Sequence, residues 1–355
     1  MGFVDGPAGH GGAAGKTNKK QPHSIMITGP SSYVSTMNFF LQHWLSANTV
    51  LGATPVVIGL PDKTSITQGQ FALLRDKLQT QQNAVQAALV NLQLARGVVN
   101  VKKGELLAKF GPFAALLDGY YQGTEFVEAR PYAPTFNDGK ENFLRPLGAM
   151  MTVWAKINEG PAPDGVTLPL LLGDGTSQGA FATVLSALIF SYASMEAKEV
   201  LLQLARGARN LTQARAYATM RIYREVAPDK FMMHPDLLET LPRLTPLPGH
   251  TPERVNASAT YEAPNQSKVV YDASPEPTLA RYELRGNGGD DYSEEDAVVI
   301  AMNEPGAARE FVTPFALNQP GARVALKVYV VLNTGNEAGS AALFVQRPVS
   351  VPLAA

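Results

Sequence analysis

The sequence contains no cysteine and little charge. Without cysteine, the chain has neither disulfides nor thiolate ligands for a metal. Charged residues make up 17% of its 355 residues, against roughly 25% in an average soluble protein. A surface poor in charge repels copies of itself weakly and loses little solvation when it is buried. The composition therefore favours self-association.

The net charge and the hydropathy pattern argue against two classes of partner. The formal net charge is −1, so no overall attraction to nucleic acid or to an anionic membrane is expected. No run of about 18 consecutive apolar residues occurs, which predicts that no helix inserts into a membrane. The N-terminal sequence lacks the apolar core of a signal peptide. The expected location is the cytoplasm, with non-Sec export to an extracellular assembly as the alternative.

Residues 1–31 are rich in Gly and Lys, the composition of a flexible arm rather than of a packed core. Within this arm, residues 10–17 (HGGAAGKT) differ at one position from a phosphate-binding loop, which has Gly where His10 stands. Such a loop works between a strand and a helix, and neither pattern flanks it here. We therefore expect an arm that contacts a neighbouring subunit and binds no nucleotide.

Residues 32–251 contain two copies of one pattern. The letters LQLARG occur at 92–97 and again at 202–207, an offset of 110 residues. The only two tryptophans, Trp44 and Trp154, share this offset, and so do two Gln-Gly-x-Phe-Ala segments that begin at Gln68 and Gln178. Three anchors with one spacing predict a tandem repeat, with units at 32–142 and 143–251.

Each unit is expected to hold a short helix and then a long one, because apolar residues recur every three or four positions. The expected elements are a helix from Ser32 that ends before Gly52, a long helix at 67–110 broken by Gly111-Pro112, a linker at 120–142, and a long helix at 177–226 that ends at Ala227-Pro228. Gly97 and Gly207 each cost about 1 kcal/mol in mid-helix. They mark either a close helix crossing or a helix end, and the lack of stop signals after them favours continuous helices.

From residue 252 onward the hydrophobic period becomes that of strands. Strands are expected at 267–272, 279–285, 297–302, 323–332 and 341–346. The segments VVYDAS, LARYELR, VYVV and GNEAGS (269–274, 279–285, 328–331 and 335–340) resemble the B, C and F strands and the F to G turn of a fibronectin type III domain. The resemblance covers 252–348, with Tyr271 where a Trp is usual. It implies an immunoglobulin-like β-sandwich that serves adhesion, spacing or protein contact rather than catalysis.

No combination of residues indicates catalysis, a cofactor or a metal. The histidines, which are His10, His23, His43, His234 and His250, lack the spacing of metal ligands. No marked pair of carboxylates of the kind that glycosidases use occurs. Residues 290–296 hold one dense acidic cluster, made of Asp290, Asp291, Glu294, Glu295 and Asp296. A solvated loop is the favoured interpretation of this cluster, and calcium binding is the alternative.

The sequence thus predicts a multidomain chain, α then β: a tandem-repeat long-helix bundle followed by a fibronectin type III-like sandwich at 252–355. The helical repeat followed by such a domain also resembles bacterial proteins of unknown function. The leading interpretation is a non-enzymatic structural protein that self-associates into a homo-oligomer, filament or shell through its helical repeats and its arm. The alternative is an adhesion or ligand-binding module that uses the sandwich loops near Asp290. The third is an enzyme with a pocket between the long helices.

Overall fold

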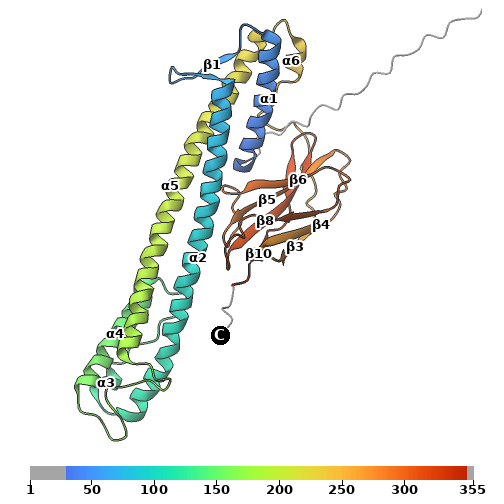
Figure 1. Ribbon diagram of the computed structural model, residues 1–355. Helices are drawn as coiled ribbons and strands as arrows, with labels where there is room; N and C mark the ends of the chain where they lie inside the picture. Colours follow the sequence, from blue (N-terminus) through green and yellow to red (C-terminus); the bar gives the residue numbers. More distant parts are fainter. Residues whose placement is uncertain (1–28, 350–355) are drawn as a thin grey trace, which may run out of the picture.

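The computed structural model describes residues 29–349, which form a long helical hairpin with a β-sandwich docked on one side (Figure 1). Helices α2 (Gln68–Tyr120) and α5 (Gln178–Lys230) run antiparallel and side by side. Each has 53 residues, a length of about 80 Å at 1.5 Å per residue. The expected N-terminal arm lies, up to residue 28, outside the described residues.

Both long helices begin one residue after their predicted starts at 67 and 177, and in each a hydroxyl side chain just before the helix acts as its cap. The Thr67 side chain accepts a hydrogen bond from the Gln70 amide at 3.3 Å, and the Gln70 side chain accepts one from the Thr67 amide at 2.8 Å. Ser177 caps α5 by accepting a hydrogen bond from the Ala180 amide at 3.1 Å. These caps satisfy amides that the first helical turn leaves free.

Both helices continue through their central glycines. A Cβ added at Gly97 or Gly207 would meet no atom within 4 Å. The two glycines therefore mark neither a helix end nor a close crossing inside the chain, and the crossing interpretation was wrong within this structure.

The predicted end of the first long helix at residue 110 was also wrong. Helix α2 passes through Pro112 and ends at Tyr120, and α5 passes Pro228 and ends at Lys230. A proline costs about 3 kcal/mol in a helix interior. Phe110, Phe113 and Leu117 are buried around Pro112, and each contributes roughly 1.5–3 kcal/mol on burial. Their packing outweighs the proline.

The hairpin has a hydrophobic cluster at each end, and a short helix closes each one. Helix α1 (Tyr33–Leu51), strands β1 (Val57–Gly59) and β2 (Ser65–Thr67) and the short helix α6 (Pro235–Glu239) pack at one end. Helix α4 (Lys140–Glu159) packs at the other. The Trp44 indole N–H donates to the Val56 carbonyl at 3.1 Å, and the Trp154 indole N–H donates to the Leu170 carbonyl at 3.2 Å. The two ends are thus built alike.

The segment between α2 and α5 is more ordered than the predicted linker at 120–142. It contains the one-turn helix α3 (Glu125–Glu128) and the first residues of α4. The short 3-10 helix η1 (Pro30–Ser32) precedes α1.

The C-terminal region is a two-layer β-sandwich. One sheet has the order β3-β4-β7, and the other has the order β10-β8-β5-β6, with β9 also paired to β8. The strands are β3 (Ala257–Glu262), β4 (Gln266–Tyr271), β5 (Leu279–Gly288), β6 (Val298–Asn303), β7 (Glu310–Thr313), β8 (Arg323–Leu332), β9 (Glu337–Gly339) and β10 (Leu343–Gln346). The sequence missed β3, β7 and β9, which are short or weakly alternating. Tyr271 fills the inter-sheet core beside Tyr282 and Phe311.

Candidate functional site

Two glutamines one heptad apart fasten the sandwich to helix α2. The Gln86 side chain accepts from the Gly288 amide at 2.9 Å and donates to the Asp296 carbonyl at 2.6 Å. The Gln93 side chain accepts from the Arg323 amide at 3.3 Å and donates to a carbonyl of the sandwich at 3.4 Å. Each amide thus uses both its donor and its acceptor on backbone groups of the sandwich.

A buried ion cluster fastens the sandwich to helix α5. The Asp296 side chain is fully buried, and its carboxylate accepts hydrogen bonds from Arg206 and Arg209, the latter at 2.8 Å. Arg209, which is 2% exposed, also donates to the Glu295 side chain at 3.0 Å. The hydrogen bond to Asp296 raises the pKa of the Arg206 guanidinium. One acidic residue of the sandwich therefore meets two cations of the hairpin.

The acidic cluster is consequently not the freely solvated loop that the sequence favours. Asp296 is buried, Asp290 pairs with Arg323 at 2.9 Å, and Glu294 pairs with Lys327 at 3.0 Å. Within residues 29–349, no group of three or more His, Asp or Glu side chains is placed to hold a metal ion. Asp290, Glu294, Glu295 and Asp296 pair with cations of the same chain, and Asp291 is exposed.

Helix α5 carries an uncovered apolar stripe on the side opposite the sandwich. Its positions follow alternating steps of four and three residues, and every one of them is exposed. We call this stripe the outer seam; its members are Ser186, Phe190, Ala193, Ala197, Val200, Leu204, Gly207, Leu211 and Ala214. None of them is charged. A 3.5-residue repeat sustained over four heptads is the pattern of a helix that pairs with another helix.

The sandwich covers the middle of the matching stripe on helix α2. At an offset of 110 residues, Val90 corresponds to Val200 and Leu94 to Leu204. Val90 is 8% exposed and Val200 is 60% exposed. A Cβ added at Gly288 would lie only 2.6 Å from the Val90 side chain, so the sandwich sits directly on the α2 stripe. The middle of this face is therefore occupied on α2 at Val90 and free on α5 at Val200.

The composition of helix α5 bears on the expectation that no helix inserts into a membrane. By length and composition, helix α5 is apolar enough to cross a membrane, and only 17% of its most apolar window is buried. This segment of α5 contains no uninterrupted apolar run of about 18 residues, because small polar residues such as Ser186 and Ser191 interrupt it. The same composition suits a seam between paired helices.

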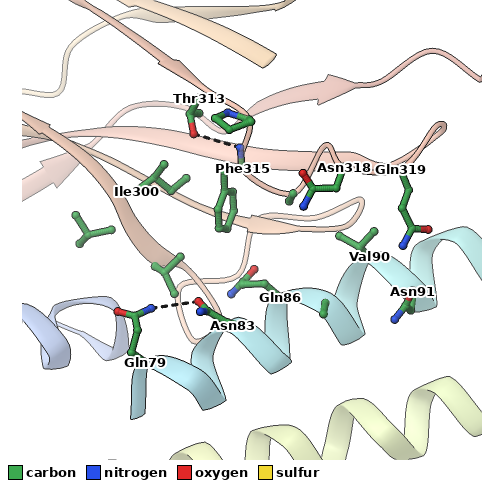
Figure 2. A pocket seen from close by; sticks show the side chains of 15 residues that line it. Gln79, Asn83, Gln86, Val90, Asn91, Ile300, Thr313, Phe315, Asn318 and Gln319 are labelled. Atoms are coloured by element: carbon green, nitrogen blue, oxygen red, sulfur yellow. Dashed lines mark hydrogen bonds between the residues drawn. The ribbon is translucent and has the colours of Figure 1, made fainter. Parts of the chain in front are cut away.

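A groove of about 540 Å³ lies where helix α2 meets the sandwich (Figure 2). Its walls carry six carboxamides, and Ile300 and Phe315 supply apolar surface. The carboxamides are those of Gln79, Asn83, Gln86, Asn91, Asn318 and Gln319. No charged side chain lines it. Amide groups both donate and accept hydrogen bonds, so this groove suits an uncharged polar ligand better than a metal or a phosphate.

Strand β5 carries a buried charge network that no pattern in the sequence indicated. Arg281, Glu283 and Arg285 alternate along the strand, and Arg285 also pairs with Glu337 at 2.5 Å. Burial alone raises the pKa of the Glu283 carboxyl, but Arg285 and Arg281 outweigh it and hold the pKa below its usual range. Every member is paired, so the network stabilises the sandwich and offers no free acid or base.

His43 lies in the end cluster, as a packing residue would. Its Nε2 donates to the Leu237 carbonyl at 2.8 Å, so its Nδ1 accepts from the Tyr223 hydroxyl at 2.7 Å. Burial lowers the pKa of the His43 imidazole, although the hydrogen bond to Leu237 opposes the change. The ring is neutral and fully bonded, and it ties α1 to the end of α5.

Comparison with known proteins bears on the C-terminal domain. The two sheets, β3-β4-β7 and β10-β8-β5-β6, form a two-layer β-sandwich of the kind that the sequence resemblance implies. The sandwich is fibronectin type III-like. No family model and no curated protein matches the chain.

Several solved structures match part of the chain, with low sequence identity and low TM-scores. A Fn3-like protein from Clostridium thermocellum is 21% identical, with a TM-score of 0.22, and covers 28% of this chain and 96% of its own. The fn3 domain of human contactin 1 is 14% identical, with a TM-score of 0.24, and covers 31% and 89%. Pectate lyase PelI from Erwinia chrysanthemi, in complex with tetragalacturonic acid, is 16% identical, with a TM-score of 0.22, and covers 26% and 28%. The Fn3-like matches fall on the C-terminal β region, and none of these likenesses supports an argument about function.

Proposed function

We propose that this protein is a non-enzymatic structural subunit that self-associates through the outer seam of helix α5. The observation that carries the proposal is the exposure of the whole seam: Phe190 and Leu211 are each 77% exposed and Leu204 is 65% exposed. Contiguous apolar surface of this kind marks an interaction site. Its heptad spacing indicates a helix as the partner.

The likeness of the two hairpin ends supports this proposal. We infer that the helical region is a tandem repeat, because both long helices have 53 residues and both tryptophans bond to the loop that follows their helix. A duplicated unit carries its contact surfaces twice. The sandwich uses one copy of the helical face, which leaves the other for a partner outside the chain.

Light scattering coupled to size exclusion tests the proposal. At micromolar concentration we expect the wild type to have a mass above the 38.0 kDa of one chain. Leu204→Glu places a charge in the seam and should return the mass to that of one chain. Leu73, which is 69% exposed on α2 away from the seam, provides the matched control, and Leu73→Glu should keep the wild-type mass.

A wild type that stays at the mass of one chain across the micromolar range contradicts the proposal. Equal effects of Leu204→Glu and Leu73→Glu would show that association does not use the seam. The contribution of the N-terminal arm, which the proposal includes, is tested by deleting residues 1–22 and repeating the measurement.

A second function, binding of an uncharged polar ligand, is favoured by the amide-lined groove. This replaces the predicted use of the loop near Asp290, whose carboxylate is paired with Arg323. The expected result is a rise in melting temperature with a neutral oligosaccharide, which Asn318→Ala together with Phe315→Ala should abolish. No rise with a panel of such sugars would remove this candidate.

A further inference from the structure

The outer seam has an internal order that points to its partner. Large side chains lie at Phe190, Val200, Leu204 and Leu211, and small ones fill the remaining positions. We infer that the seam pairs with the same seam of a second copy of this chain, antiparallel, about a two-fold axis that passes between residues 198 and 199. This inference rests on the proposed self-association and adds the partner, its direction and its register.

The antiparallel register places a small side chain opposite every large one. Across the axis Phe190 meets Gly207 of the second copy, and Leu204 meets Ala193 of the second copy. In the same way Leu211 meets Ser186, and Val200 meets Ala197. Each layer then has a similar volume, so two straight helices pack at one constant distance.

A parallel pairing lacks this match. It would set Phe190 against Phe190 and Gly207 against Gly207, so the widest and the narrowest layers would alternate along one interface. Wide layers hold the helices apart and leave gaps at the narrow ones, and such gaps forfeit contact energy. Packing therefore favours the antiparallel direction.

Charges beside the seam are compatible with this register. In the antiparallel pair, Glu196 flanks Gln203 of the second copy, and Leu201 flanks Ser194. No two like charges face each other across the axis. Two of the nearby carboxylates are engaged within the chain: Glu196 pairs with Lys140 at 2.7 Å, and Glu199 pairs with Arg96 at 3.3 Å.

The assembly closes at two chains. A two-fold axis uses the same patch on both subunits, and the middle of the equivalent patch on α2 is covered by the sandwich of the same chain at Val90. Pairing of the two α5 seams gives a four-helix bundle of two hairpins, with a sandwich on each outer side.

Cysteine cross-linking tests direction and register, and the chain has no cysteine to interfere. Two variants, Ala193→Cys and Leu204→Cys, are produced separately and also co-expressed with different affinity tags. In the antiparallel register the two different sites face each other, whereas identical sites lie about 16 Å apart along the axis at 1.5 Å per residue. A disulfide needs Cα atoms within roughly 7 Å.

The expected result is a disulfide-linked dimer in the co-expressed sample and none in either single sample. Self-linking of Ala193→Cys alone would show a parallel pair and overturn the inference. Dimers by light scattering that never cross-link in the mixed sample would overturn the register while leaving self-association intact. A monomeric wild type would overturn the proposed function together with this inference.

Discussion

Asp296 is the residue whose loss should separate the sandwich from the helical hairpin. Its side chain is fully buried and bonds to both Arg206 and Arg209, and Arg209 is 2% exposed. The variant Asp296→Asn keeps the shape but leaves two guanidinium groups without their carboxylate. Removing one partner of a buried ion pair costs about 3–5 kcal/mol.

A cost near the lower end of this range is expected for Asp296→Asn, because Arg209 keeps its ion pair with Glu295 and the Arg206 side chain is one-quarter exposed. A loss of about 3 kcal/mol weakens docking of the sandwich roughly hundredfold. Hydrogen exchange should report it, because opening exposes amides that docking protects. We expect faster exchange in the amides around Gly288 and Arg323, which Gln86 and Gln93 hold, and faster proteolysis at 240–256.

Glu295→Gln is the matched control. The Glu295 side chain is 57% exposed and pairs with the same Arg209, and an exposed pair contributes roughly 0–1 kcal/mol. This variant should exchange nearly as the wild type does. Unchanged exchange in Asp296→Asn, or a larger effect in Glu295→Gln, would refute the assignment of Asp296 as the anchor.

Three further changes have outcomes fixed by local geometry. Gly97→Ala should raise the free energy of unfolding by about 1 kcal/mol in chemical denaturation, because the added methyl meets no atom within 4 Å. Gly288→Ala should undock the sandwich in the proteolysis assay, and the double variant with Val90→Ala should restore docking by removing the side chain that lies 2.6 Å from the new Cβ. Burial holds the folded-state pKa of His43 below the ordinary value of 6.5, so the stability that the neutral ring contributes is complete above pH 6.5 and declines as pH falls toward the folded pKa. His43→Gln should flatten the fall in melting temperature between pH 7.5 and 5.5; an unchanged slope would contradict the assignment.

Much of the helical region could be predicted from periodicity and caps. The starts of both long helices follow from Thr67 and Ser177, since capping is a local property of a few neighbouring residues. The ends were harder, because whether Pro112 stops a helix depends on how much the residues around it bury. That burial is set by residues from α4 and α5, far away in the sequence.

The candidate site likewise has one feature that the sequence predicts and one that only the fold decides. The heptad spacing of the outer seam is a property of the α5 sequence from Ser186 to Ala214, and counting steps of four and three residues would have found it. Asp296 could not be told from its acidic neighbours, because nothing local distinguishes a carboxylate that will be buried against Arg209 from one that stays in water. Burial of a charge depends on partners that only the fold brings near.

The sequence by itself determined that this chain has two long helices, each with an inner and an outer face, whose matching segments lie 110 residues apart, because helical periodicity and that offset are properties of the order of residues. Only the tertiary structure decided which outer face is covered. Val90 and Val200 occupy the same place in their helices, yet the sandwich is placed on Val90. The sandwich has a single surface that docks on the hairpin, where it is held by side chains of the two long helices: Gln86, Gln93, Arg206 and Arg209. Because it has only one such surface, it covers the outer face of α2 around Val90 and leaves the outer face of α5 exposed.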